Sequence, residues 1–253
     1  MIFKPLVRIL LPVLSLLFAF SMLAFQHIEN KQQSKEKLVK KGVTVVELFT
    51  SQGCSSCPPA DELLSTVKNN PNVIALSYHV DYWNKLGWKD PYSDASYSSY
   101  QRSYAKQLQS GVYTPQMVVN GSSEFIGSRK SILNSNLAKK SNVTSIIAPV
   151  VKRSDNSISY SYDLDGQDGF ESAYALLVLE EHITAISSGE NANKKLKNVN
   201  IVVERVELNK NSVVGKSQFN LPQTEDKNAK YRVAILLQNK NLEVTAAGIS
   251  TLG

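Results

Sequence analysis

Residues 43–61 of the chain read V-T-V-V-E-L-F-T-S-Q-G-C-S-S-C-P-P-A-D and contain both cysteines of the protein, Cys54 and Cys57. An apolar run precedes a glycine-containing turn, the two thiols have C-x-x-C spacing, and a helix-like segment follows them. A C-x-x-C pair between a buried strand and a helix is typical of redox-active dithiols. The stretch therefore predicts a redox centre where a strand turns into a helix.

The residues around this centre predict a β-α-β unit. The apolar run from Val43 to Phe49 is typical of a buried parallel strand. Leucine and valine recur at helical spacing over residues 61–69, and the sequence N-N-P ends that helix. Residues 73–80 predict a second strand, and the crossover between the two strands is expected to be right-handed.

A second group of elements follows this unit. We expect an aromatic-rich loop, a helix, the two strands of a hairpin and a last helix at residues 81–92, 93–108, 116–119, 123–126 and 129–140. Asn120-Gly121 is a strong hairpin-turn signal, and Ser128 is a candidate cap for the last helix.

The resulting order, β-α-β, helix, β-hairpin and helix, is that of the thioredoxin fold. The chain also contains the blocks F-T-S-Q-G-C-S-S-C-P-P-A-D, H-V-D-Y-W-N-K-L-G-W-K-D-P, Y-T-P-Q-M-V-V-N-G and G-E-N. With these blocks it resembles, over roughly residues 43–248, a bacterial family of secreted, thioredoxin-like proteins catalogued as a domain of unknown function. The resemblance implies the fold and export, and the family has no settled activity.

The likeness to thioredoxins implies a separate role for each thiol. Cys54 would be the attacking thiolate, because free N–H groups and the dipole at a helix N-terminus lower the pKa of a thiol. Cys57, one turn further on, would attack a mixed disulfide at Cys54 and release the product. The predicted function is an extracytoplasmic thiol-disulfide oxidoreductase that needs no cofactor.

Four further residues match roles in such a site. Thr114 and Pro115 lie where thioredoxins keep a cis-proline that faces the disulfide, beside backbone that pairs with an extended substrate. Glu47 is placed like the buried acid that deprotonates the second cysteine, and burial would raise its pKa. Trp83 belongs to an aromatic loop that could bind a peptide, although aromatic side chains also simply pack.

The redox turn departs from that of common thioredoxins at three positions. Gly53 stands where they have a tryptophan, and Pro58 and Pro59 follow Cys57 directly. Because proline lacks an N–H group, the helix is expected to begin near Pro58, with proline at an early helical position.

Two other interpretations of the cysteine pair stay open. In the first, Cys54, Cys57 and His79 form a copper or zinc site, as in a metallochaperone, although a zinc site normally needs four ligands. In the second, the pair is a structural bridge, which is less usual for cysteines three positions apart than for distant ones.

The second half of the chain predicts a mainly antiparallel, sandwich-like β-domain after the α/β thioredoxin-like domain. The domain boundaries are expected at residues 43–142 and 143–253, with a polar linker at 26–42. Strand candidates occupy residues 146–151, 158–162, 174–179, 199–208, 231–238 and 242–246. We expect this domain to cover or support the redox module.

Residues 1–25 predict a signal peptide or a signal anchor that leads to the periplasm or to the extracytoplasmic face of the membrane. Lys4 and Arg8 precede an uncharged apolar run at residues 9–25. Residues 1–41 hold seven Lys and Arg against two Glu, so they carry most of the net charge of +6. The residues after position 41 are nearly neutral overall, which argues against a nucleic-acid partner. The expected partners are a thiol- or disulfide-containing protein substrate and a redox partner.

Overall fold

The computed structural model of the protein describes residues 42–209, 212–221 and 229–251. The predicted signal or anchor segment and the predicted linker before Gly42 lie outside the described residues. Of the helices that belong to the described residues, none combines the length and the apolar character that a membrane crossing requires.

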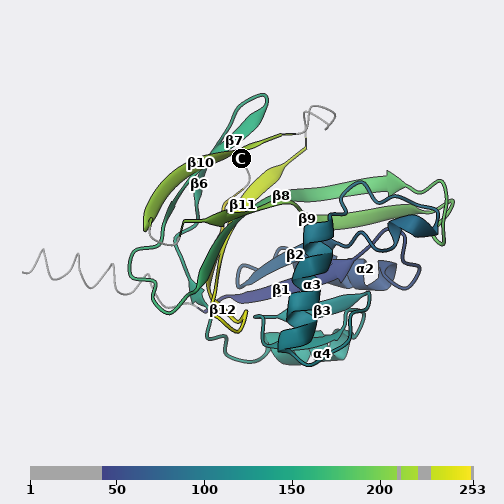
Figure 1. The fold of residues 1–253 in the computed structure, drawn as a ribbon, viewed down its shortest axis with the longest axis horizontal. Coiled ribbons are helices and arrows are strands. Elements are labelled where there is room, and N and C mark those ends of the chain that lie inside the picture. Colours follow the sequence, from purple (N-terminus) through teal and green to yellow (C-terminus); the bar gives the residue numbers. More distant parts are fainter. Residues whose placement is uncertain (1–41, 210–211, 222–228, 252–253) are drawn as a thin grey trace, which may run out of the picture. The chain divides into compact units, whose positions relative to one another are not determined.

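The described residues form one mixed α/β unit with a large sheet (Figure 1). Its helices are α2 (Pro58–Val67), the 3₁₀-helix η1 (Asn84–Leu86), α3 (Ala95–Gln107) and α4 (Lys130–Leu137). Its strands are β1 (Thr44–Thr50), β2 (Val73–His79), β3 (Gln116–Val119), β4 (Ser123–Ile126), β5 (Thr144–Ser145), β6 (Val150–Arg153), β7 (Ser157–Asp163), β8 (Ser172–Ala185), β9 (Lys195–Leu208), β10 (Val214–Asn220), β11 (Tyr231–Gln238) and β12 (Val244–Ile249).

The stretch around the cysteines forms the β-α-β unit that its pattern predicts. β1 is buried along its whole length and pairs in parallel with β2, so that Thr44 lies opposite Val73. Between them α2 begins at Pro58, which confirms the predicted start of this helix. Proline suits the first helical positions because the N–H group that it lacks would have no intrahelical partner there.

The hairpin turn between β3 and β4 is also confirmed. Asn120 and Gly121 both have positive φ angles, 53° and 67°, in a tight turn that Ser122 N closes by donating to Val119 O at 3.1 Å. Asn120 Oδ1 in addition accepts a hydrogen bond of 2.8 Å from Val45 N. The turn residue therefore also ties the hairpin to β1.

One nine-stranded sheet runs through both halves of the chain. Its strand order is β4-β3-β1-β2-β9-β8-β11-β12-β5. β9 joins β2 in parallel through the pairing of Ser77 with Ile201 and is antiparallel to β8 on its other side. The sheet therefore continues across the expected boundary at residue 142, and the long β8–β9 hairpin lies directly beside β2 (Figure 1).

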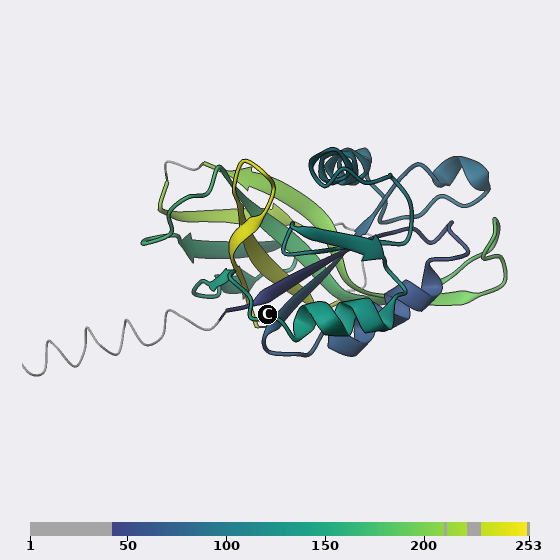
Figure 2. The same ribbon diagram turned by 90° about the horizontal axis from the view of Figure 1, so that it is seen from below.

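Helices cover both faces of the first half of the sheet. Figure 2 shows α3 on one side and α2 with α4 on the other. Alternate residues of β1 serve the two faces: Val45 and Phe49 pack in the α3-side cluster, whereas Val46 and Leu48 pack in the cluster of α2 and α4. Each fully buried side chain of this size stabilises the fold by about 1.5–3 kcal/mol.

The second half of the sheet packs against a separate three-stranded sheet of order β10-β7-β6. Tyr160 of β7 and Phe219 of β10 stack with ring centroids 5.0 Å apart. Both belong to a core cluster with Leu177 of β8 and Val233 of β11. Two sheets thus face each other here, and one of them is the sheet that also contains β1 and β2.

Three local expectations are wrong. Ser128 does not cap α4: its N-cap residue is Arg129, whose N–H donates to Ile126 O in a turn. Residues 146–151 are not one strand, since Pro149, which has no N–H for a ladder, lies between β5 and β6. Strand β10 was not among the strand candidates, because Phe219 is its one buried residue and no apolar alternation marks it.

Candidate active site

The two cysteines lie beyond the carboxyl end of β1, where the chain turns into α2. They form a disulfide with their Cα atoms 5.5 Å apart. Cys57 is the N-cap residue of α2, so the pair lies at a helix N-terminus, where a thiolate is stabilised. Both cysteines are fully buried, with 0% of their surface exposed, whereas Ser55 and Ser56 between them are exposed.

Two hydroxyl-bearing side chains contact Cys54, one from the same turn and one from the segment before β3. Thr114 Oγ1 donates a hydrogen bond of 3.2 Å to Cys54 Sγ, and Ser56 Oγ lies 3.3 Å from the same sulfur. Trp83 Nε1 in turn donates to Thr114 Oγ1 at 2.8 Å. The peptide bond between Thr114 and Pro115 is cis. The structure therefore brings all three predicted substrate-binding residues to the cysteine pair.

Glu47 lies apart from this group. Its carboxylate accepts hydrogen bonds from Tyr100 Oη at 2.9 Å and from Tyr104 Oη at 2.7 Å, both on α3. Burial raises the pKa of Glu47, and the two tyrosine hydroxyls act against this shift. Glu47 shares the face of β1 that α3 covers, because side chains alternate along a strand. The helix that begins next to Cys57 packs on the opposite face.

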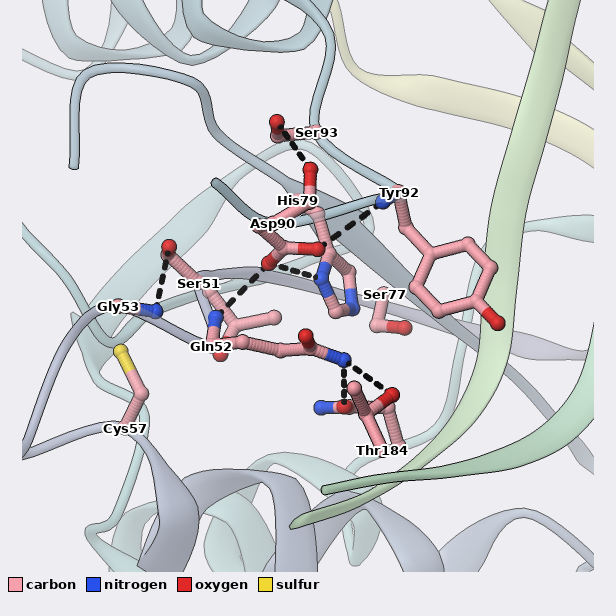
Figure 3. A network of polar contacts seen from close by, with 12 residues as sticks. Ser51, Gln52, Gly53, Cys57, Ser77, His79, Asp90, Tyr92, Ser93 and Thr184 are labelled. Carbon is pink, nitrogen blue, oxygen red and sulfur yellow. Dashed lines mark hydrogen bonds and ion pairs between the residues drawn. The ribbon is translucent and has the colours of Figure 1, made fainter. Parts of the chain in front are cut away.

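A buried polar network lies behind the redox turn (Figure 3). His79 Nδ1 and Asp90 Oδ2 are 2.7 Å apart, and both residues are almost completely buried. Asp90 Oδ2 also accepts from Gln52 N at 2.8 Å, two residues before Cys54. The Gln52 side chain then donates to Thr184 Oγ1 at 2.9 Å. The network thus links β2, the redox turn and β8.

His79 and Asp90 form an ion pair inside this network. Burial alone would lower the pKa of His79 and raise the pKa of Asp90. The charge and the hydrogen bond of the partner outweigh burial in each case, so the pKa of His79 is raised and the pKa of Asp90 is lowered. Both shifts favour an imidazolium that faces a carboxylate.

The tip of the β8–β9 hairpin forms hydrogen bonds with the backbone of the redox turn. Asn191 Nδ2 donates to Gln52 O at 3.0 Å and to Cys54 O at 2.9 Å. Next to it, Glu190 accepts a hydrogen bond of 3.0 Å from Ser55 N. The backbone before and between the cysteines is therefore fixed by a segment more than 130 positions away in the chain.

The family model described as "Protein of unknown function (DUF1223)" matches residues 45–238, which include every residue of this site. The chain belongs to this family. A search of curated proteins finds no match.

Solved structures with folds similar to this DUF1223 chain include two bacterial proteins. Protein AGR_C_4864 from Agrobacterium tumefaciens is 29% identical with a TM-score of 0.59, and the match covers 83% of this chain and 94% of that one. HBP35 of Porphyromonas gingivalis is 14% identical with a TM-score of 0.57, and the match covers 83% of this chain and 75% of that one. At the lower identity the likeness shows the fold alone.

The alternative metal site is not assembled in this DUF1223 chain. The sulfurs of Cys54 and Cys57 are bonded to each other, and His79 Nδ1 faces Asp90. Across the described ranges, no group of three or more His, Cys, Asp and Glu residues is arranged to hold a metal ion.

Three residues of this site, Gln52, Asp90 and Asn191, are not marked by any of the predicted thiol chemistry. All three lie in the blocks that support the family resemblance, namely S-Q-G-C, K-D-P and G-E-N. Each of these blocks contains a polar residue that has no part in thiol chemistry. Because buried polar groups need hydrogen-bond partners, such residues could have indicated a buried polar network.

Proposed function

We propose that this protein is a thiol-disulfide oxidoreductase that acts through Cys54 and Cys57. The observation that carries the proposal is the disulfide at the N-terminus of α2 with Thr114 Oγ1 3.2 Å from Cys54 Sγ. A hydroxyl group that donates to this sulfur would also donate to a thiolate formed there, and such a bond stabilises the charge. This supports Cys54 as the attacking thiolate and Cys57 as the resolving thiol.

In the reducing direction, the Cys54 thiolate attacks a substrate disulfide. It bonds to one substrate sulfur and releases the other as a thiolate. Cys57 then loses its proton and attacks Cys54 Sγ, so that the internal disulfide forms and the second substrate sulfur leaves. Oxidation of a substrate dithiol follows the same steps in reverse.

The burial of both cysteines bears on how a substrate would reach them. A protein substrate contacts Cys54 only when neighbouring side chains move, since the residue has no exposed surface. Trp83 and Thr114, which are hydrogen-bonded to each other beside Cys54, are the proposed substrate-facing residues together with Pro115. The expected partners are a protein with a reactive thiol or disulfide and a second redox protein.

We further infer a thioredoxin-like arrangement for residues 43–142 and an extracytoplasmic location. The order of elements from β1 to α4 supports the arrangement. The apolar run at residues 9–25 after Lys4 and Arg8 supports export. An oxidising compartment is where a disulfide between two cysteines persists.

A trapping experiment tests the proposed function. Cys57→Ser retains Cys54 and lacks the resolving thiol, so mixed disulfides with substrate proteins are expected to accumulate in cells and to disappear on reduction. Cys54→Ser is the matched control and should trap few or none. The proposal is wrong if Cys57→Ser traps no more than this control and the purified wild-type protein neither oxidises nor reduces a model dithiol.

A further inference from the structure

A second buried carboxylate lies on the helix that begins at the cysteines. Asp61 is one turn beyond Cys57 in α2, and Asp61 N donates to Cys57 O at 3.2 Å. Side chains four positions apart on a helix lie on the same side, with Cβ atoms about 5–6 Å apart. Asp61 is 6% exposed and is thus an acid buried beside the resolving cysteine. Glu47, by contrast, faces α3 on the other side of the sheet.

Polar and charged groups face Asp61 from every element that packs against it. Thr50 Oγ1 of β1 donates to Asp61 Oδ2 at 3.1 Å, and Asn198 of β9 also hydrogen-bonds the carboxylate. His79 of β2 and Asp90 of the loop after it act on Asp61 through their charges. Burial raises the pKa of Asp61 to about 7, against the opposing effects of His79, Thr50 and Asn198. The carboxyl group can therefore both take up and release a proton near neutral pH.

A cavity borders Asp61. It has a volume of about 230 Å³ and is lined by Pro58, Asp61, Glu62, Lys195, Leu196 and Lys197. Glu62, Lys195 and Lys197 are exposed, whereas Asp61 is buried. A water molecule needs only about 10–15 Å³ of such space, so this cavity next to Asp61 has room for water.

We propose that Asp61 is the proton acceptor for Cys57 and exchanges its proton with solvent through this cavity. This proposal rests on the proposed function and identifies the group that accepts the proton in its second step. When a mixed disulfide at Cys54 is resolved, the Cys57 thiol gives its proton to the Asp61 carboxylate and its sulfur bonds to Cys54 Sγ. The bond between Cys54 and the substrate sulfur breaks, and the substrate leaves as a thiolate. Asp61 then loses the proton to water in the cavity. In the oxidising direction the protonated Asp61 protonates the departing Cys57 thiolate.

A two-step reaction with dithiobis(nitrobenzoate) separates this proton transfer from the first attack. The reduced protein releases one nitrothiobenzoate when Cys54 attacks the reagent and a second one when Cys57 resolves the mixed disulfide. In Asp61→Asn the second step is expected to slow at least about 10-fold near pH 7, while the first step changes less than about 2-fold. In the wild-type protein, the rate of the second step plotted against pH should have an inflection near the pKa of Asp61, about 7. The variant should lack this inflection.

Glu62→Gln is the matched control, because Glu62 follows Asp61 and lines the same cavity but is exposed. Equal second-step rates in Asp61→Asn and Glu62→Gln would overturn the assignment. An equilibrium measurement gives an independent test: in a Cys54→Ser background, Asp61→Asn should lower the pKa of the Cys57 thiol, because a neighbouring carboxylate disfavours the thiolate. An unchanged Cys57 pKa would also overturn it.

These readouts use a synthetic disulfide and no protein substrate. Failure of the trapping experiment would therefore remove the proposed function and leave the role of Asp61 toward Cys57 intact. Failure of the Asp61→Asn tests would remove the proton acceptor and leave the proposed function in place.

Discussion

Asn191 Nδ2 donates a hydrogen bond of 2.9 Å to the main-chain carbonyl of Cys54, although 137 positions separate the two residues. The same amide donates to Gln52 O at 3.0 Å. A single buried side chain at the tip of the β8–β9 hairpin thus ties down the turn that leads into the cysteine pair. Without it, Gln52 O and Cys54 O each lose one hydrogen bond, although Cys54 O still accepts from Cys57 N at 3.2 Å.

Asn191→Ala is expected to lower the free energy of unfolding by about 1–3 kcal/mol, since two buried carbonyls lose a hydrogen bond each and Cys54 O keeps the one from Cys57 N. The disulfide should also react faster with dithiothreitol, because the turn that buries it is less restrained. Urea unfolding and reduction kinetics measure the two effects. Asn69→Ala, which removes an exposed asparagine after α2, is the control. Equal stabilities of the two variants would contradict the prediction.

Thr114→Val should raise the pKa of the Cys54 thiol, because the valine side chain has the same shape but no hydroxyl to donate to the sulfur. The measurement is the ultraviolet absorbance of the thiolate against pH in a Cys57→Ser background. Thr66→Val is the control, since Thr66 Oγ1 donates to Leu63 O on α2. A Cys54 pKa that is the same in both variants would rule out this contribution of Thr114.

Glu47→Gln should destabilise the protein without slowing either step of the reaction with dithiobis(nitrobenzoate). Tyr100 donates to Glu47 Oε1 and Tyr104 donates to Glu47 Oε2, so the NH2 group of glutamine removes the acceptor that one of the two tyrosines faces. The expected loss is about 1–3 kcal/mol in urea unfolding. A slowed second step in this variant would instead identify Glu47 as an acid that acts on Cys57.

Asp61 makes the stability of the wild-type protein depend on pH. Its pKa is about 7 in the folded protein against an ordinary value of 3.8, so folding favours the protonated acid. Ionisation of Asp61 therefore lowers the free energy of unfolding. This loss is absent below pH 3.8, grows as the pH rises, and approaches about 4 kcal/mol above pH 7. Asp61→Asn should therefore be more stable than wild type near pH 8 and nearly equal to it near pH 3 in urea unfolding. Glu62→Gln should leave the pH profile unchanged, and a pH-independent difference between Asp61→Asn and wild type would contradict this account.

The His79–Asp90 pair adds stability within a defined pH window. The pKa of Asp90 in the folded protein is below 3.8. Its contribution to the free energy of unfolding is therefore present above pH 3.8 and is lost as the pH falls through that folded-state pKa. The pKa of His79 is above 6.5, so its contribution is full below 6.5 and is lost as the pH rises through the folded value.

Asp90→Asn should consequently cost about 3–5 kcal/mol between these limits, because it leaves a buried imidazole without its counter-charge. The loss should become smaller as the pH rises through the folded-state pKa of His79, which lies above 6.5, because the wild-type imidazolium then loses its proton. Urea unfolding at a series of pH values measures both. Asp94→Asn, which alters an exposed N-cap of α3, is the control. A loss that does not vary with pH would contradict the ion pair.

Short-range sequence patterns determined the elements around the cysteines. The apolar run of β1, the prolines after Cys57 and the Asn120-Gly121 dipeptide act within a few residues, through burial, a missing N–H group and positive φ angles. Such effects can be inferred without knowledge of the rest of the chain. The cysteine spacing and the place of the pair at a helix N-terminus were predictable for the same reason.

Only the tertiary structure decided which distant side chains meet at this turn. Asn191 contacts the redox turn because β9 pairs with β2 and the β8–β9 hairpin continues from that pairing, and Asp90 does so because the loop after β2 folds back to His79 and Gln52 N. No local pattern encodes these pairings. Glu47 and Asp61 differ for a similar reason. Both are buried acids near Cys57 in the sequence, but strand alternation turns Glu47 toward α3, whereas the helical repeat places Asp61 on the side of α2 that carries Cys57.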